Sequence, residues 1–230
     1  MRITEIFSSI QGEGPFMGVP SFFVRLAGCN LRCGWCDTPQ SSWTPVGKEM
    51  SIAEILQKVA ESRMKTVVVT GGEPFLQAEF PELCDALMAA GLSVHLETSG
   101  TIFREVSADL VCVSPKLSGS APDPLKFPEL YAKHERARLS PETLSQFVRY
   151  FGKRLVFKFV VASKTDVHEV KALLNQLDFT DTAQVFLMPQ SRTAEELRDL
   201  APMVAGFCVE SGFRYSDRLH VRLWGNTPGR

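Results

Sequence analysis

The sequence lacks any apolar run close to the roughly 20 residues that a membrane-spanning helix requires, and its first residues lack the apolar core of a secretory signal peptide. It also lacks long runs of Lys or Arg, and its 25 basic and 26 acidic residues give a formal net charge of -1. This balance disfavours a nucleic-acid-binding or membrane-surface protein. We therefore expect a cytoplasmic protein that acts on a small molecule, with neither nucleic acid nor membrane as a partner.

No internal repeat, low-complexity tract or linker-like segment divides the 230 residues, of which 44% are hydrophobic. A chain of this length and composition can bury one core without disulfide bonds, so we expect a single domain over residues 1–230. Six cysteines are present. Three of them, Cys84, Cys112 and Cys208, stand singly in apolar surroundings and are expected to be buried structural thiols.

Apolar segments of strand length alternate with segments of helical periodicity. Strands are expected at residues 22–26, 67–70, 94–97, 110–114, 155–161 and 185–188, and helices at 51–62, 80–91, 164–177 and 193–204. Ser51 and Glu54 form a capping-box signature at the first of these helices. The alternation predicts a parallel sheet in an α/β, partial TIM-like barrel of the (β/α)6 type. Residues 116–138, rich in Pro and charge, predict a long loop or irregular insertion after the fourth strand.

Three cysteines, Cys29, Cys33 and Cys36, form a C-x3-C-x2-C pattern directly after the strand expected at 22–26. A closed structural zinc site needs four ligands, and the common ferredoxin patterns use four cysteines per cluster. Three cysteines can instead hold three irons of a 4Fe-4S cluster and leave the fourth iron open to a cofactor or substrate. We favour this open cluster; a zinc site completed by a distant histidine remains the alternative.

Polar groups also follow the other expected strands. Gly71, Gly72 and Glu73 come after VVVT, where two glycines permit close approach to a ligand and a carboxylate can accept bonds from an ammonium group. Later strand ends carry ETSGT, VSPK and Gln190. Because the carboxyl ends of parallel strands meet at one edge, these groups are expected to converge on one pocket.

The cysteine pattern, the aromatic Trp35 before its third cysteine and the GGEP sequence resemble the signature of the radical S-adenosylmethionine superfamily. The resemblance implies that the open iron binds S-adenosylmethionine. It also implies that one electron from the cluster cleaves this cofactor to a radical that removes a hydrogen atom from substrate. In such enzymes the cofactor supplies the difficult chemistry, while the protein holds it and excludes water.

The stretch EIFSSIQGEGPFMGVPSFFVRLAGCNLRCGWCDT, together with TGGEP, ETSGT, SPK and LWGN, resembles the 7-carboxy-7-deazaguanine synthase family over nearly the whole chain. That family has a reduced (β/α)6-type barrel and acts as a homodimer. It converts 6-carboxy-5,6,7,8-tetrahydropterin to 7-carboxy-7-deazaguanine and ammonia, on the route to queuosine and other 7-deazapurines. The resemblance implies an external electron donor, such as a flavodoxin.

Matching the family's motifs residue by residue implies the following roles. The cluster ligands are Cys29, Cys33 and Cys36. The expected contacts of S-adenosylmethionine are Trp35, Asp37, Gly71, Gly72, Glu73, Gly100, Ser114, Pro115, Lys116 and Gln190. The expected substrate contacts are Ile10, Gln11, Gly12, Arg25, Thr98 and Pro228.

Two of the implied roles can be weighed on chemical grounds. Arg25 matches a binder of the substrate carboxylate, a role that suits a guanidinium because it can donate two parallel bonds; the alternative is a salt bridge at a strand end. Thr38 matches a Mg2+ ligand. A single neutral hydroxyl is a poor Mg2+ site unless substrate oxygens and water complete the octahedron.

Two further readings are open at this stage. A glycyl-radical-enzyme activase shares the cysteine pattern and a GGEP-like turn, but IQGEG, Arg25 and the CDT sequence argue against it, because an activase has no pterin or carboxylate to bind. A zinc-binding interaction module would use the same cysteines for structure alone.

Overall fold

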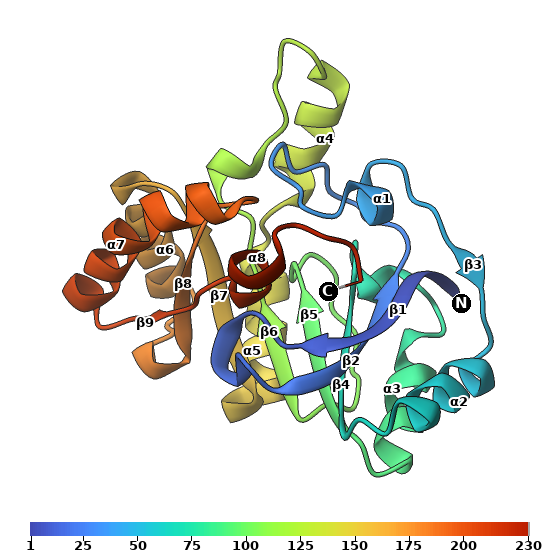
Figure 1. Ribbon diagram of the computed structural model, residues 1–230. Helices are drawn as coiled ribbons and strands as arrows, with labels where there is room; N and C mark the ends of the chain where they lie inside the picture. Colours follow the sequence, from blue (N-terminus) through green and yellow to red (C-terminus); the bar gives the residue numbers. More distant parts are fainter. Residues whose placement is uncertain (230) are drawn as a thin grey trace.

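All six strands expected from the sequence form the centre of an open, nine-stranded sheet (Figure 1). The protein is described by a computed structural model over residues 1–229. These strands pair in parallel in the order β2, β4, β5, β6, β7 and β8. Their bounds are Pro20–Leu26 for β2, Thr66–Gly71 for β4, Ser93–Thr98 for β5, Leu110–Val113 for β6, Leu155–Val161 for β7 and Val185–Pro189 for β8. The expected partial barrel is therefore confirmed.

Three further strands extend the sheet at its two edges and were not expected. Strand β1 (Arg2–Ile10) pairs antiparallel with β2, β3 (Lys48–Glu49) pairs with β1, and β9 (Arg214–Tyr215) continues the sheet beyond β8. The sequence of β1 mixes polar and apolar residues and therefore lacks the continuous apolar run that marks a buried strand. The register of this hairpin sets Glu5 opposite Arg25.

Helices α2 (Ile52–Ser62), α3 (Phe80–Ala89), α6 (Lys164–Gln176) and α7 (Ala194–Ser211) confirm the four expected helices. The predicted capping box is present, because the Ser51 hydroxyl accepts a bond from the Glu54 amide and the Glu54 carboxylate accepts one from the Ser51 amide. No helix among residues 1–229 is both long and apolar enough to cross a membrane.

The insertion after β6 is less irregular than expected. It contains a short 3-10 helix, η3 (Ser118–Ser120), and a regular helix, α4 (Pro128–Ala137). Proline usually ends a helix, but Pro128 occupies the first position of α4. The amide of that position has no hydrogen-bond partner within a helix, so its absence does not destabilise α4. Figure 1 shows α4 projecting from the sheet beside the loop that carries the three-cysteine pattern.

The remaining short elements connect these parts. They are the helices α1 (Pro39–Ser42), α5 (Pro141–Phe151) and α8 (Leu219–Trp224), and the 3-10 turns η1 (Gly14–Phe16), η2 (Pro74–Leu76), η4 (Gly152–Arg154) and η5 (Thr182–Gln184).

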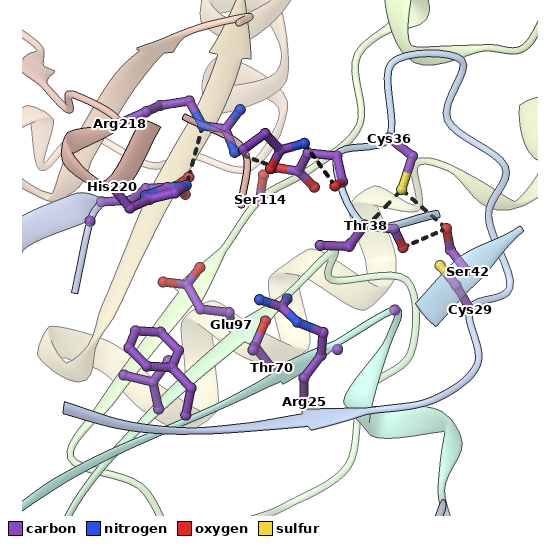
Figure 2. A pocket seen from close by; sticks show the side chains of 18 of the residues that line it. Arg25, Cys29, Cys36, Thr38, Ser42, Thr70, Glu97, Ser114, Arg218 and His220 are labelled. Carbon is purple, nitrogen blue, oxygen red and sulfur yellow. Dashed lines mark hydrogen bonds and ion pairs between the residues drawn. The ribbon is translucent and has the colours of Figure 1, made fainter. Parts of the chain in front are cut away.

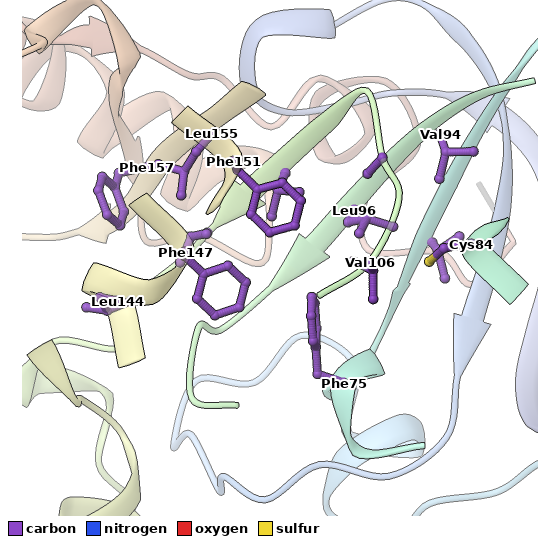
Figure 3. Packing of buried hydrophobic residues seen from close by; sticks show 14 of the residues in the cluster. Phe75, Cys84, Val94, Leu96, Val106, Leu144, Phe147, Phe151, Leu155 and Phe157 are labelled. Carbon is purple, nitrogen blue, oxygen red and sulfur yellow. The ribbon is translucent and has the colours of Figure 1, made fainter. Parts of the chain in front are cut away.

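The core follows from the two-residue period of the strands. Alternate side chains, such as Val94 and Leu96 of β5, point toward the outer helices and belong to one large buried cluster (Figure 3). On the inner face, Cys112, Val156 and Phe186 form a second, small apolar cluster. Cys84, Cys112 and Cys208 are free and buried, as expected. The interior of the barrel is thus filled at one level and leaves polar side chains nearer the carboxyl ends of the strands.

Gly100, which follows β5, provides a test of this packing. Its φ is +74°, and an added Cβ would lie 2.6 Å from Val113 Cγ1 and 2.7 Å from Leu144 Cδ2. We expect Gly100→Ala to lower the free energy of unfolding by about 2–4 kcal/mol, because backbone strain and overpacking add. Urea denaturation of identically prepared proteins measures this loss.

The matched control is Gly91→Ala. Gly91 also has a φ of +74°, but nothing lies within 4 Å of its added Cβ. This variant should lose only about 1–2 kcal/mol from backbone strain. Equal losses in the two variants would contradict the account, because they would mean that Val113 and Leu144 move aside without cost.

Candidate active site

A pocket with a volume of about 410 Å³ opens at the carboxyl ends of the parallel strands. Figure 2 shows Cys29, Cys36 and Thr38 on one side of it, Arg218 and His220 on the opposite side, and Arg25, Thr70 and Glu97 between them. A volume of this size is typical of sites for small molecules. The fold therefore gathers the predicted cluster loop and several predicted binding residues around one cavity.

Most of the residues predicted from the sequence line this pocket. They are Ile10, Gln11, Gly12, Arg25, Cys29, Cys33, Trp35, Cys36, Asp37, Thr38, Gly71, Gly72, Thr98, Ser114, Lys116 and Pro228. Gln190 lies instead in a smaller cavity of about 90 Å³, which shares Trp35, Asp37 and Arg218 with the main pocket. Glu73, Gly100 and Pro115 are buried and are not among the residues that line either cavity. Arg230 lies outside the described residues.

Hydrogen bonds to the insertion hold the loop that carries the three cysteines. We call this loop, residues 28–38, the cluster loop. The amide of Arg32 donates to Nδ1 of His134 on α4, at 3.1 Å, and the amide of Gly34 donates to the Ser120 carbonyl, at 3.0 Å. The indole of Trp35 donates to the Gly119 carbonyl. The insertion thus braces the cluster loop from outside the pocket.

The thiols of the cluster loop suit a soft metal cluster. Burial raises the pKa of Cys29 to about 11 and that of Cys33 to about 12, so both thiols are protonated at neutral pH in the absence of metal. Metal binding would then release protons and relieve the burial of a charged thiolate. Cys36 Sγ lies 3.1 Å from Ser42 Oγ, a neighbour able to donate to a thiolate. Three soft ligands on the wall of one pocket fit an iron-sulfur cluster with an open iron.

The TGGEP turn has a structural function that the sequence alone did not reveal. A Cβ on Gly71 would lie 2.4 Å from the Leu26 carbonyl oxygen, and one on Gly72 would lie 2.2 Å from the Gly28 carbonyl oxygen. These glycines therefore allow the end of β4 to pack against the main chain that leads into the cluster loop. Both glycines also line the pocket, and their close approach to a ligand stays a prediction.

Glu73 is completely buried and joins the ends of β4 and β5. Its carboxylate accepts bonds from Thr98 Oγ1 at 2.8 Å, from the Ser99 amide at 2.8 Å and from the Ser99 hydroxyl. Burial raises its pKa, although these bonds favour the charged form. In this arrangement Glu73 sets the positions of Thr98 and Ser99, which do line the pocket. A contact between Glu73 and a cofactor stays a prediction.

Arg25 projects from β2 into the pocket and pairs with Glu5 of β1. Its Nε lies 2.6 Å from Glu5 Oε1, which is the salt bridge considered as the alternative to substrate binding. This contact uses Nε and fixes the plane of the guanidinium. The two terminal nitrogens remain available for a bidentate bond to a carboxylate.

Thr38 offers one hydroxyl to the pocket, 4.0 Å from Cys36 Sγ. Within residues 1–229, no group of three or more His, Cys, Asp or Glu side chains could hold a single metal ion. Its assignment as a Mg2+ ligand stays a prediction.

Several charged residues of the pocket were not predicted as site residues. Glu97, Lys158, Glu13, Arg218 and Asp37 follow one another with alternating charge; we call them the charge row. Lys158 Nζ lies 2.9 Å from Glu97 Oε2 and 2.6 Å from Glu13 Oε2, and Arg218 Nε lies 3.0 Å from Glu13 Oε1. Arg218 also contacts Asp37, which was expected as a cofactor contact; Glu97 belongs to the ETSGT strand end that was expected to face the pocket.

Mutual attraction keeps Glu13 and Lys158 of the charge row ionised, although burial opposes both charges. Burial opposes ionisation of Glu13, yet Lys158 and Arg218 hold its pKa well below the usual range. Burial likewise disfavours the Lys158 ammonium, but its anionic neighbours hold its pKa well above the ordinary value. A lysine within the apolar run LVFKFVV was the one clear sequence signal of this network, because an unpaired lysine is rarely buried.

The C-terminal residues close one side of the pocket. The Leu219 amide at the start of α8 donates to the Gly12 carbonyl at 2.9 Å, and Asn226 Nδ2 donates to the Asp37 carbonyl at 3.2 Å. Asn226, Thr227, Pro228 and Gly229 line the pocket, as does His220. The residues around Pro228 thus form part of the pocket wall, and a contact between Pro228 and substrate stays a prediction.

Comparison with known proteins agrees with this site. Residues 24–154 match the model of the radical SAM superfamily. A 7-carboxy-7-deazaguanine synthase from Rhodopirellula baltica is 40% identical over 229 residues, which cover 100% of this chain and 88% of that protein. One from Halobacterium salinarum is 41% identical over 238 residues, covering 99% of this chain and 92% of that protein.

Two solved structures have a similar fold. QueE from Escherichia coli superposes with a TM-score of 0.69 at 27% identity, covering 95% of this chain and 94% of that one. Streptococcus suis SuiB bound to S-adenosylmethionine shares the fold, with a TM-score of 0.51 at 15% identity over 86% of this chain and 48% of that one. Because the family model matches more than half of the chain and the relatives match nearly all of it, the chain belongs to the 7-carboxy-7-deazaguanine synthase family of the radical SAM superfamily.

Proposed function

We propose that this protein is a 7-carboxy-7-deazaguanine synthase, a radical S-adenosylmethionine lyase that converts 6-carboxy-5,6,7,8-tetrahydropterin to 7-carboxy-7-deazaguanine and ammonia. The product holds the atoms of the substrate less those of ammonia, so the ring contraction needs no net oxidant. The observation that carries the proposal is that one pocket unites three cluster-type cysteines with Arg25 and the IQGEG loop. The family relationship supplies the identity of the substrate.

Cys29, Cys33 and Cys36 would hold the 4Fe-4S cluster, and the strand-end residues predicted above would hold S-adenosylmethionine. When bound, these groups supply the one-electron chemistry that removes and returns a hydrogen atom. The protein's own residues bind and orient the pterin. In this proposal Arg25 binds the 6-carboxylate, and Ile10, Gln11 and Gly12 contact the ring.

The charge row and the C-terminal segment complete this environment. Lys158 is 4% exposed and Gln11 is 7% exposed, so these polar groups of the pocket are largely shielded from water. The tail around Pro228 covers the pocket and would exclude water from a reactive radical.

Mg2+ is proposed to bind Thr38 together with substrate oxygens. One hydroxyl supplies too little charge to hold a hard dication alone, so substrate and water must provide the other ligands.

The reaction needs a reductant from outside the chain, which we propose to be a small electron carrier such as a flavodoxin. We also propose a homodimer, as the family resemblance implies, and a cytoplasmic location. The six free thiols support a reducing compartment.

The assay of the proposed function is anaerobic. The reconstituted protein should contain iron and sulfide, and with reductant, S-adenosylmethionine, Mg2+ and 6-carboxytetrahydropterin it should form a deazaguanine chromophore. Product should appear with release of ammonia in equal amount. A fully loaded cluster without product would redirect the assignment to a glycyl-radical-enzyme activase. Zinc without sulfide would point to a structural zinc module.

Arg25→Ala tests the carboxylate contact. Loss of a charge-assisted bidentate bond costs about 1.5–3 kcal/mol, so the KM for the pterin should rise about 10- to 100-fold. The Kd for S-adenosylmethionine should change less than about threefold. Steady-state kinetics and calorimetry measure the two effects.

Glu5→Gln is the matched control, because it removes the salt bridge to Arg25 and keeps the guanidinium. Its KM should rise much less than that of Arg25→Ala. If the two variants lose pterin affinity equally, Arg25 has a structural function and not a binding one.

Binding of Mg2+ at Thr38 can be tested directly. Calorimetry on the cluster-loaded enzyme should show weak Mg2+ binding without substrate and at least tenfold tighter binding when the pterin is present, because substrate oxygens then enter the coordination shell. Thr38→Ala should reduce that increase. Tight Mg2+ binding by the substrate-free enzyme would remove the proposed shared site.

A further inference from the structure

Arg218 is the residue of the pocket that contacts the most widely separated parts of the chain. It is 5% exposed. Its guanidinium donates to Glu13 of the IQGEG loop, to the Ser191 carbonyl after β8 and to Asp37 of the cluster loop. Each of its three nitrogens donates one of these bonds, a spread of donors that the single nitrogen of an ammonium group cannot reproduce.

The two loops that Arg218 joins serve different ligands in the proposed function. Gln11 and Gly12 are expected to contact the pterin, whereas Asp37 is expected to contact S-adenosylmethionine. Asp37 also lies between Cys36 and Thr38, a cluster ligand and the proposed Mg2+ ligand. Arg218 therefore links the substrate side of the pocket to its cofactor side through a buried guanidinium that pairs with two half-buried carboxylates.

The segment that carries Arg218 is attached to both loops by further bonds. Ser216 Oγ accepts from the Gly14 amide at 2.8 Å, and the Leu219 amide donates to the Gly12 carbonyl at 2.9 Å. On the other side, Asn226 donates to the Asp37 carbonyl. Residues 216–229, the closing segment, can thus dock fully only when both loops have their ordered positions.

We propose that Arg218 is a positioning residue that makes binding of the pterin and of S-adenosylmethionine cooperative. The inference rests on the proposed function for the identity of the two ligands. Either ligand orders its own loop and, through Arg218, docks the closing segment. The second ligand then binds to a loop that is already ordered, so less conformational entropy is lost in this second step and its affinity is higher. Cooperative binding would keep the cofactor from being cleaved before substrate is enclosed.

The test measures affinities without turnover. Cluster-loaded wild-type enzyme is titrated anaerobically, with Mg2+ and no reductant, with S-adenosylmethionine in the absence and presence of saturating 6-carboxytetrahydropterin. The reverse titration follows. We expect each ligand to lower the Kd of the other by the same factor, at least about fivefold, because linkage is reciprocal. A factor of one in the wild-type enzyme overturns the proposal.

The coupling factor is the factor by which one ligand lowers the Kd of the other. Direct contact between the two ligands would also raise this factor above one, and Arg218→Lys separates the two explanations. Lysine keeps the charge, but its compact ammonium cannot reach the three separate positions that the guanidinium fork reaches, so the factor should fall below about two if Arg218 carries the coupling. Retention of the wild-type factor in this variant contradicts the proposal. Arg222→Gln is the matched control, because Arg222 lies on α8, which begins directly after Arg218, and forms its ion pair with Asp217. Its factor should equal that of the wild type.

Two additional measurements keep the outcome decisive. If Arg218→Lys does not retain a cluster, Glu13→Gln removes one charge from the contact and should also lower the factor, so an unchanged factor there counts against Arg218. The wild-type preparation is also assayed for product. Absence of product refutes the proposed function, whereas product without cooperative binding refutes only this inference.

Discussion

The alternation of side chains along the parallel strands is the constraint on which the rest of the structure depends. One set of side chains packs against the outer helices and forms the main core. The other set must face the interior of the open barrel. There, a small apolar cluster fills one level, and the next inward-facing residues of two of the same strands, Lys158 of β7 and Met188 of β8, line the pocket. A shift of one residue in any of these strands would exchange the core with the site.

Charge inside the barrel is tolerated because it is paired. A buried ion deprived of its partner costs about 3–5 kcal/mol, whereas an alternating row of carboxylates and cations compensates each charge on both sides. Lys158 and Glu13 illustrate this balance, since their mutual attraction outweighs the burial that opposes each charge. The result is a polar interior in which the described ion pairs balance the buried charges.

The cluster loop depends on two independent supports. From below, Gly71 and Gly72 let the end of β4 approach the main chain at Leu26 and Gly28. From outside, the insertion that carries α4 supplies acceptors for the amides of the loop. A loop with three free thiols has little tendency to adopt one conformation by itself, so these contacts preorganise it before a cluster is present.

The sequence by itself determined the six central strands, four of the helices, the cysteine loop and the polar strand ends, because these follow from local periodicity and from motifs whose residues are adjacent in the chain. It could not reveal β1, since that strand is recognisable only by its pairing with β2. It predicted a long loop or irregular insertion over residues 116–138, where the structure has the helix α4. Tertiary structure alone decided that Gly71 and Gly72 approach the protein's own backbone, that Arg25 also pairs with Glu5, and that Arg218 meets Glu13 and Asp37. The physical reason is sequence distance: the charges of a buried network come from segments far apart in the chain, and only folding brings them within range of one another.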